Sequence, residues 1–313
     1  MTIIGVVTTG LTWRPSFDPP QFPELPEYLL PENTLFYRQV TDLPVSPDSE
    51  RWIGALGAEP LVAPFGGKPY LGNVAGMPFN MVDKSTSLVD VALTQYPEIS
   101  FPGPYPLASP PLIEGLPNYG NDQHYLAIDP ESRTAWELIA LRRWFTRWEA
   151  GAGGRWNMDS VDYPDGWTIV AQLPLLPGVV RYEEVAAGRI NHMILGMFEI
   201  SAKGKHTWPA RSTDGQSTDP DAPPMGAWMR LRADVDLSEL GPQAKVVAQA
   251  AQTYGILISD TGPGFRMRGT ADSRWDRNDL RTLETLTTDD FEFVDVSSII
   301  IDEDTLAVNQ PAS

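Results

Sequence analysis

The stretch PGVVRYEEVAAGRINHMILGMFEISAKGKHTWPARSTD, residues 177–214, decides how the chain is organised. It holds two adjacent carboxylates, Glu183 and Glu184, and two of the three histidines of the chain. Its middle, residues 190–200, is mostly apolar with β-branched and aromatic members, a pattern typical of a buried strand. A buried strand flanked by acidic, basic and aromatic side chains predicts the floor of a cleft.

The composition bounds the class of protein and its partners. The chain has 313 residues, of which 42% are hydrophobic, enough for a large core. Its formal net charge of −18 repels phosphate backbones, so we expect no nucleic-acid partner. The absence of cysteine excludes disulfides, thiolate metal sites and cysteine nucleophiles.

The N-terminus bears on where the protein acts. The opening MTIIGVVTTGLTW has neither a basic region nor a sustained apolar run, so it does not read as a secretory signal. No run approaches 18 apolar residues, and we expect no membrane insertion. These features predict cytoplasmic synthesis, with release by lysis or as part of a virion as the route out of the cell.

Short apolar runs separated by turn residues predict a mainly β fold. We expect an antiparallel β-sandwich, jelly-roll-like and with long loops, as a single domain over residues 36–301, followed by a flexible tail at 302–313. Residues 124–128 and 134–140 read as a hairpin, whereas 141–148 fits a helix or a further strand. One main helix is predicted near 242–254 from its apolar stripe, and a shorter one at 279–286.

The first 35 residues are predicted to form an N-terminal strand and a proline-rich docking arm. Residues 13–35 show neither a helical nor a strand period, and proline favours an extended backbone. Aromatic and leucine side chains spaced along this arm predict that it packs on protein. The surface it covers is either its own domain or a neighbouring subunit, so a homo-oligomer and other protein neighbours stay open.

Several motifs give the chain a resemblance to a known group. They are GMPFNMVD, FPGPYPL, LPLLPGVVRYEEVAAGRINH, TWPAR, PPMGAWMRLRADVDLS, YGILISDTG and SRWDRNDL, and they follow one another from about residue 70 onward. With them the chain resembles a group of often secreted bacterial β-sandwich proteins. The resemblance implies the sandwich fold and a contact with glycans, and it implies no particular activity. The proline-rich front of this chain departs from that pattern.

Carboxylates next to strand-like aromatic segments are the catalytic candidates. Glycoside cleavage commonly uses two acids about 5 to 9.5 Å apart across the scissile bond. The candidates are Glu137, Asp159, Glu184 and Asp260. Glu183 would face away from Glu184 on a strand, because neighbouring side chains point to opposite faces. The alternative is that these acids bind arginines or backbone amides in loops.

His192 is the remaining catalytic candidate, and three further residues are candidates for ligand binding. A histidine suits proton transfer near neutral pH, although one beside apolar residues is commonly a hydrogen-bonded core residue. Trp208 offers a face for a sugar ring, and Arg211 and Arg189 offer directional donors. The alternative for the tryptophan is a place in the core.

We expect no cofactor and no metal. No spacing of histidines matches a zinc site. The acidic loop at residues 213–221 leaves calcium open, but its spacing differs from that of an EF-hand.

Three functions remain. The first is a glycan-binding structural or adhesion protein, such as a phage-tail or other virion component that contacts a polysaccharide of the bacterial envelope. The second is a glycan-cleaving hydrolase, and the third is a scaffold without a ligand.

Overall fold

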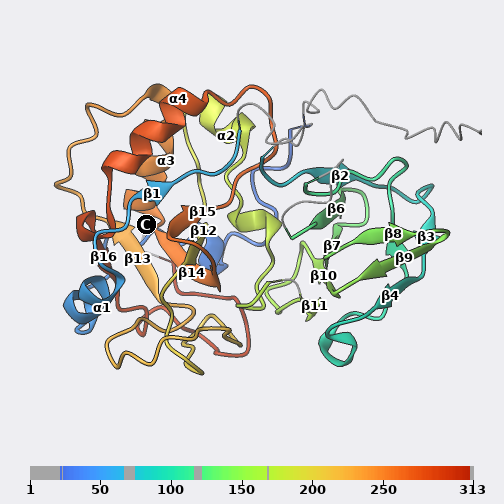
Figure 1. Ribbon diagram of the computed structural model, residues 1–313, viewed down its shortest axis with the longest axis horizontal. Coiled ribbons are helices and arrows are strands. Elements are labelled where there is room, and N and C mark those ends of the chain that lie inside the picture. The colour runs from blue at the N-terminus through green and yellow to red at the C-terminus, as the bar shows by residue number, and fades with distance from the viewer. Residues whose placement is uncertain (1–21, 23, 67–74, 116–121, 168, 311–313) are drawn as a thin grey trace, which may run out of the picture.

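The structure is a computed structural model that describes residues 22, 24–66, 75–115, 122–167 and 169–310. Strands account for 28% and helices for 17%, so the prediction of a mainly β chain is confirmed. The strands gather in two larger sheets, at the left and right of Figure 1. None of the helices in the described ranges is long and apolar enough to cross a membrane.

The first sheet has six strands in the order β1-β15-β12-β14-β13-β16. Their bounds are Leu61–Val62 (β1), Phe265–Met267 (β15), Ile194–Phe198 (β12), Ile256–Thr261 (β14), Trp228–Leu231 (β13) and Phe291–Phe293 (β16). The central pair, β12 and β14, is parallel, with Leu195 opposite Leu257. Nearly continuous apolar sequence suits such covered strands. The strand predicted at 190–200 is therefore confirmed, but the purely antiparallel arrangement is wrong for this sheet.

The helices lie beside this sheet (Figure 1). They are α1 (Ser49–Leu56), α2 (Tyr182–Ala186), α3 (Pro242–Thr253) and α4 (Arg277–Leu280). Helix α3 confirms the main predicted helix: it starts with proline, buries an alanine and valine stripe, and ends before Gly255, whose φ is +75°. The carboxylate of Asp279 accepts hydrogen bonds from the first-turn N–H groups of Gln243 and Ala244. Helix α4, with the 3-10 turn Arg281–Thr285, confirms the shorter one.

The second sheet has five strands in the order β11-β10-β7-β6-β2. Their bounds are Asp165–Gly166 (β11), Ala152–Asn157 (β10), Thr134–Ile139 (β7), Tyr125–Asp129 (β6) and Phe79–Met81 (β2). The predicted hairpin is confirmed as β6 and β7, which pair antiparallel. Two smaller sheets extend this half of the molecule: β4 (Val91–Leu93), β9 (Arg147–Ala150) and β8 (Arg142–Trp144), and the pair β3 (Leu88–Val89) and β5 (Tyr105–Pro106).

The buried apolar side chains form two clusters. The larger one surrounds the six-stranded sheet and includes helix α3 and Phe79 of β2. The smaller one lies among the strands of the second half and includes Tyr105, Tyr125 and Leu138. The assignment of residues 36–301 to one domain stays a prediction.

The described part of the N-terminal arm lies on its own chain. Phe22, Leu29 and Leu30 are buried in the larger cluster, and the ring of Phe22 stacks on Phe79 with centroids 4.4 Å apart. The hydroxyl of Tyr37 accepts hydrogen bonds from the N–H groups of Leu29 (2.7 Å) and Leu30 (3.1 Å). Much of the predicted arm, residues 13–21 and 23, is outside the described residues.

Three residues of the predicted flexible tail pack on the rest of the chain. Leu306, Ala307 and Val308 are buried, and the N–H of Val308 donates to the carbonyl of Asn33 (2.8 Å). Their apolar side chains and backbone hydrogen bonds tie this end of the chain to the start of the described region.

Candidate functional site

Helix α2 carries Glu183 and Glu184, so the opposite orientation that these neighbours would have on a strand does not apply. Glu184, in the first turn, accepts a hydrogen bond from the backbone N–H of Arg181 (3.3 Å), a contact typical of a helix start. Two carboxylates in the first turn also interact favourably with the helix dipole. Neighbours on a helix are about 100° apart rather than 180°, so both acids reach one cavity.

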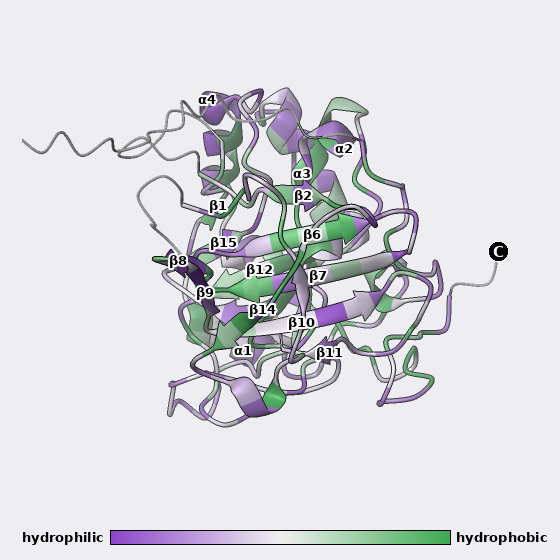
Figure 2. Ribbon diagram, turned by 90° about the vertical axis from the view of Figure 1, so that its right-hand side faces the viewer, coloured by the Kyte–Doolittle hydropathy of each residue, from purple (hydrophilic) through white to green (hydrophobic). Residues whose placement is uncertain are grey.

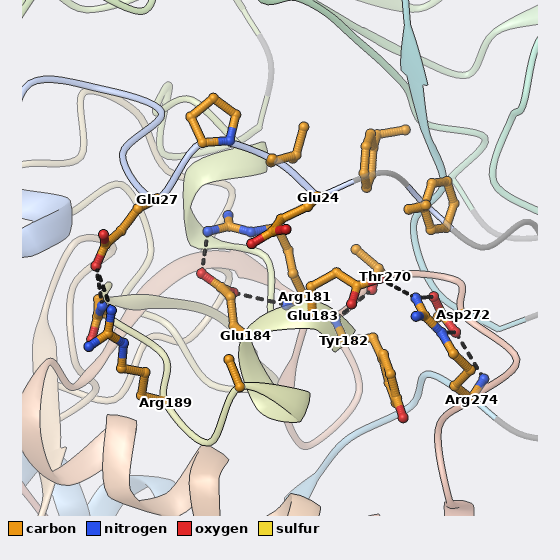
Figure 3. Close-up of a pocket in the computed structure, with 16 residues that line it drawn as sticks. Glu24, Glu27, Arg181, Tyr182, Glu183, Glu184, Arg189, Thr270, Asp272 and Arg274 are labelled. Atoms are coloured by element: carbon orange, nitrogen blue, oxygen red, sulfur yellow. Dashed lines mark hydrogen bonds and ion pairs between the residues drawn. The ribbon is translucent and has the colours of Figure 1, made fainter.

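This cavity is open to solvent and has a volume of about 160 Å³ (Figure 3). Its charged walls come from helix α2 with the residues after it, the N-terminal segment, and the loop after β15, and Phe79 of β2 completes the lining. Half of the 16 lining residues are charged, and Phe22, Leu25 and Phe79 form an apolar margin. Its charged side chains are Glu24, Glu27, Arg181, Glu183, Glu184, Arg189, Asp272 and Arg274.

Glu184 lies between Arg181 and His192 at the back of the cavity. It forms an ion pair with Arg181, and its Oε2 atom lies 3.1 Å from Nε2 of His192. Burial alone would raise the pKa of Glu184, but Arg181 and His192 together outweigh burial and lower that pKa. Glu184 is therefore an ionised carboxylate at neutral pH.

His192 is 1% exposed and both of its ring nitrogens have partners. Nδ1 lies 2.8 Å from the carbonyl oxygen of Met193, and Nε2 faces Glu184. A carbonyl oxygen and a carboxylate oxygen are both hydrogen-bond acceptors, so each ring nitrogen of His192 is engaged. This histidine supports Glu184 and has no ring nitrogen left for a ligand.

Arg274 forms the opposite wall. Its guanidinium pairs with Glu183 and with the fully buried carboxylate of Asp272, and it lies 4.2 Å from the centroid of the Tyr182 ring. The hydrogen bond to Asp272 is the main reason that its pKa is raised. The cation is held in place from three sides, so its remaining N–H groups have a defined direction.

A third set of polar groups lies at the rim. Glu27 accepts hydrogen bonds from the side chains of Arg189 (3.2 Å) and Asn191 (2.8 Å). The carboxylate of Glu24, also on the N-terminal segment, has no hydrogen-bond or ion-pair partner among the residues that the structure describes. Arg181, which also lines this cavity, has a buried Nη1 atom without a hydrogen-bond partner.

Glu137, a predicted catalytic acid, has a structural role on β7. It is 2% exposed and accepts hydrogen bonds from Nε1 of Trp156 (3.0 Å) and from the N–H groups of Leu175 (3.0 Å) and Leu176 (3.2 Å). It satisfies the donors of the apolar link between the two sheets. This arrangement is the alternative that the sequence left open, an acid bound to backbone amides.

Asp260, another predicted acid, lies on β14 beside Arg268, outside the cavity lining. Burial raises its pKa to about 6 in spite of that arginine. Arg268 also contacts the buried His124, whose Nε2 lies 3.3 Å from Nη1 of the arginine. Burial and the adjacent guanidinium hold the pKa of His124 well below its ordinary value.

The remaining candidates lie elsewhere on the molecule. Asp159 is exposed and pairs with an arginine across a loop. Nε1 of Trp208 faces the carbonyl of Thr305 (3.4 Å), and the guanidinium of Arg211 lies 4.4 Å from the ring centroid of Tyr163. Of the eight predicted site residues, only Glu184 and Arg189 line the cavity, with His192 behind Glu184. The eight candidates therefore do not converge on one site.

Sequence reasoning missed most of the cavity. Glu24 and Glu27 lie in the proline-rich arm, which was expected to pack on protein and not to line a site. Asp272 directly precedes SRWDRNDL and Arg274 lies within it, a stretch that carried the resemblance but no predicted chemistry. The acidic loop at 213–221 is engaged with its neighbours, since Asp221 pairs with Arg51. Among the described residues, no group of three or more acidic or histidine side chains is arranged to hold a metal ion. Comparisons with protein-family models, curated proteins and solved structures find no match for the chain.

Proposed function

We propose that the protein binds glycans and that the cavity beside α2 takes one sugar unit. The observation that carries the proposal is the lining itself: held carboxylates and guanidiniums face one open space from three walls. Sugar hydroxyls are donors and acceptors at once, so a sugar ring can bond to both kinds of group. Phe22 and Leu25 would cover its apolar C–H surface.

The buried Nη1 of Arg181 supports a ligand at this place. A buried donor without a partner costs about 1–3 kcal/mol or more, and the cost is larger for a charged group. An acceptor oxygen brought by a ligand would satisfy this donor. The unpaired carboxylate of Glu24 would accept from a hydroxyl on the same ligand.

The size of the cavity favours one unit of a longer chain. Its 160 Å³ is roughly five times the ~30 Å³ share of a water molecule in the liquid. Pockets that enclose whole drug-sized ligands are larger, about 300–1,000 Å³. A terminal or side-chain sugar of a polysaccharide would enter, while the rest of the polymer stays outside.

The ionised carboxylate of Glu184 favours glycan binding over glycan cleavage. A glycosidase needs a carboxylic acid that still holds its proton near working pH. The lowered pKa of Glu184 makes it an acceptor, and both ring nitrogens of His192 are engaged. Binding without turnover suits an adhesion role. The experiment below distinguishes this role from a hydrolase and from a scaffold without a ligand.

The test is incubation of the protein with a panel of bacterial envelope polysaccharides, measuring binding by calorimetry and the release of reducing ends. We expect saturable binding to at least one polysaccharide and no release. Release of reducing ends would establish the hydrolase instead. No binding across neutral, acidic and amino-sugar polymers would leave the scaffold as the explanation.

A further inference from the structure

The hairpin formed by β8 and β9 projects from the half of the molecule opposite the six-stranded sheet (Figure 1). Trp144 pairs with Arg147, so only Phe145 and Thr146 form the turn. β8 is the outer strand of its small sheet, and all three of its residues are exposed. Figure 2 shows it at the side of that half, with the hydrophilic colour of its arginines.

The tip of the hairpin exposes two large aromatic side chains. Trp144 is 63% exposed and Phe145 is 86% exposed. Phe145 also has a φ of +55°, in the left-handed region where the first residue of a short turn is usually glycine. Both the exposed ring and the backbone conformation are unfavourable in the isolated protein. Burial of the exposed ring in an apolar environment would be favourable and would offset the cost of the backbone conformation.

The flanks of the tip are basic in an otherwise acidic protein. Arg142, Arg143 and Arg147 are three of the 23 basic residues of a chain whose net charge is −18. Among the described residues, Arg143 and Arg147 have no ion-pair partner, and Arg142 reaches only Glu149, at 4.0 Å. Arg143 lies over the ring of Trp148, 5.8 Å from its centroid. These unpaired cations favour an anionic partner.

We propose that this hairpin docks the protein on the surface of an anionic lipid bilayer. Exposed tryptophan and phenylalanine beside arginine is the combination that seats a segment at the headgroup level without spanning the membrane. The apolar tip would enter the boundary of the acyl region, and the arginines would face anionic headgroups. The acidic remainder of the protein is screened beyond about 8 Å at physiological ionic strength.

The geometry favours a bilayer over the two other kinds of partner. The rings of Trp144 and Phe145 stand at 88° to each other, so they form no flat platform for a sugar. A stable protein interface needs about 1,000 Å² or more of buried surface, whereas a two-residue tip presents far less. A bilayer requires no matching pocket and accepts a small protruding tip.

The test is co-sedimentation of the full chain with vesicles of phosphatidylcholine alone and with phosphatidylglycerol added. We expect binding only to the anionic vesicles, weakened by high salt. Replacing the three arginines by glutamine should reduce partitioning about fivefold for each charge removed. Trp144→Ser and Phe145→Gly should each reduce it about tenfold.

Phe145→Gly separates docking from folding, because glycine accepts the positive φ and should keep or raise the Tm. The matched control is Ile99→Ser, which removes a 50% exposed apolar side chain elsewhere in the same half and should leave binding unchanged. The proposal would be overturned if the wild type bound neither kind of vesicle, or if Phe145→Gly bound anionic vesicles as well as the wild type does. If the wild type self-associates but binds no vesicles, and Trp144→Ser abolishes this self-association, the partner of the hairpin is a second copy of this chain. Glycan binding by these variants should be unchanged, so the two proposals fail separately.

Discussion

Nε2 of His192 lies 3.1 Å from Oε2 of Glu184, at the back of a cavity whose other walls come from distant parts of the chain. This contact joins two of the catalytic candidates that the sequence offered. The same contact makes both unsuited to proton transfer, because Glu184 is held ionised and the histidine ring has no free nitrogen. It is the basis of the first prediction.

Glu184→Gln should destabilise the fold by about 3 kcal/mol at pH 7, because it leaves the buried Arg181 without its counter-charge and His192 without its carboxylate partner. The pKa of Glu184 is lowered in the folded state, so its contribution is present above its ordinary value of 4.5 and is lost as pH falls through the folded value. Urea unfolding at several pH values should show the difference from wild type shrinking below about pH 4. Glu183→Gln, at a more exposed ion pair, should cost less than about 1 kcal/mol. Equal costs for the two variants would contradict this account.

Asp260→Asn should remove a pH dependence of stability that is opposite in sign to the one contributed by Glu184. The pKa of Asp260 is raised to about 6, so between about pH 4 and 6 the folded protein holds a proton that the unfolded chain releases. Stability therefore falls as pH rises through this window, by up to about 3 kcal/mol for this group. Thermal or urea unfolding should show this fall in the wild type and its absence in the variant. Asp159→Asn, on the surface, is the control, and it should follow the wild-type slope.

Arg189→Gln should weaken glycan binding by about 1.5–3 kcal/mol, the scale of a hydrogen bond to a charged group. The Arg189 side chain is 69% exposed, so its loss should leave the Tm within a degree or two of wild type. Calorimetry with the polysaccharide found in the panel measures the change. Arg51→Gln removes a similar exposed ion pair outside the cavity and should bind as wild type does. Normal glycan binding by Arg189→Gln would show that the glycan site lies outside this cavity.

Leu29→Ala should cost about 2–5 kcal/mol, because the side chain is fully buried in the larger cluster and its removal leaves a cavity. Denaturant unfolding measures the loss. Leu88→Ala, at a side chain that is 64% exposed, should change stability by less than about 0.5 kcal/mol. If both variants unfold alike, the N-terminal segment is not part of the core.

Elements with a strong local pattern could be predicted from the sequence. Helix α3 combines a proline start, an apolar stripe and a glycine after its end, and strand β12 is a short, nearly unbroken apolar run. Helix α2 was missed because five residues are too few for a helical period, and its start depends on a side-chain contact within the first turn. The parallel pairing of β12 with β14 was missed because strand direction in a sheet depends on the connection between the strands rather than on either strand.

The sequence by itself determined the mainly β class, the two helices of the C-terminal region, the acidic charge and the absence of cysteine chemistry. Only the tertiary structure decided which charged groups meet. Glu183 and Arg274 are 91 positions apart, and Arg189 and Glu27 are 162 apart. Such pairs leave no period in the sequence, because an ion pair depends on where packing places two segments and not on the residues beside either partner. The hairpin tip is the converse case: its residues are adjacent in LRRWFTRW, and the fold decided that they face outward.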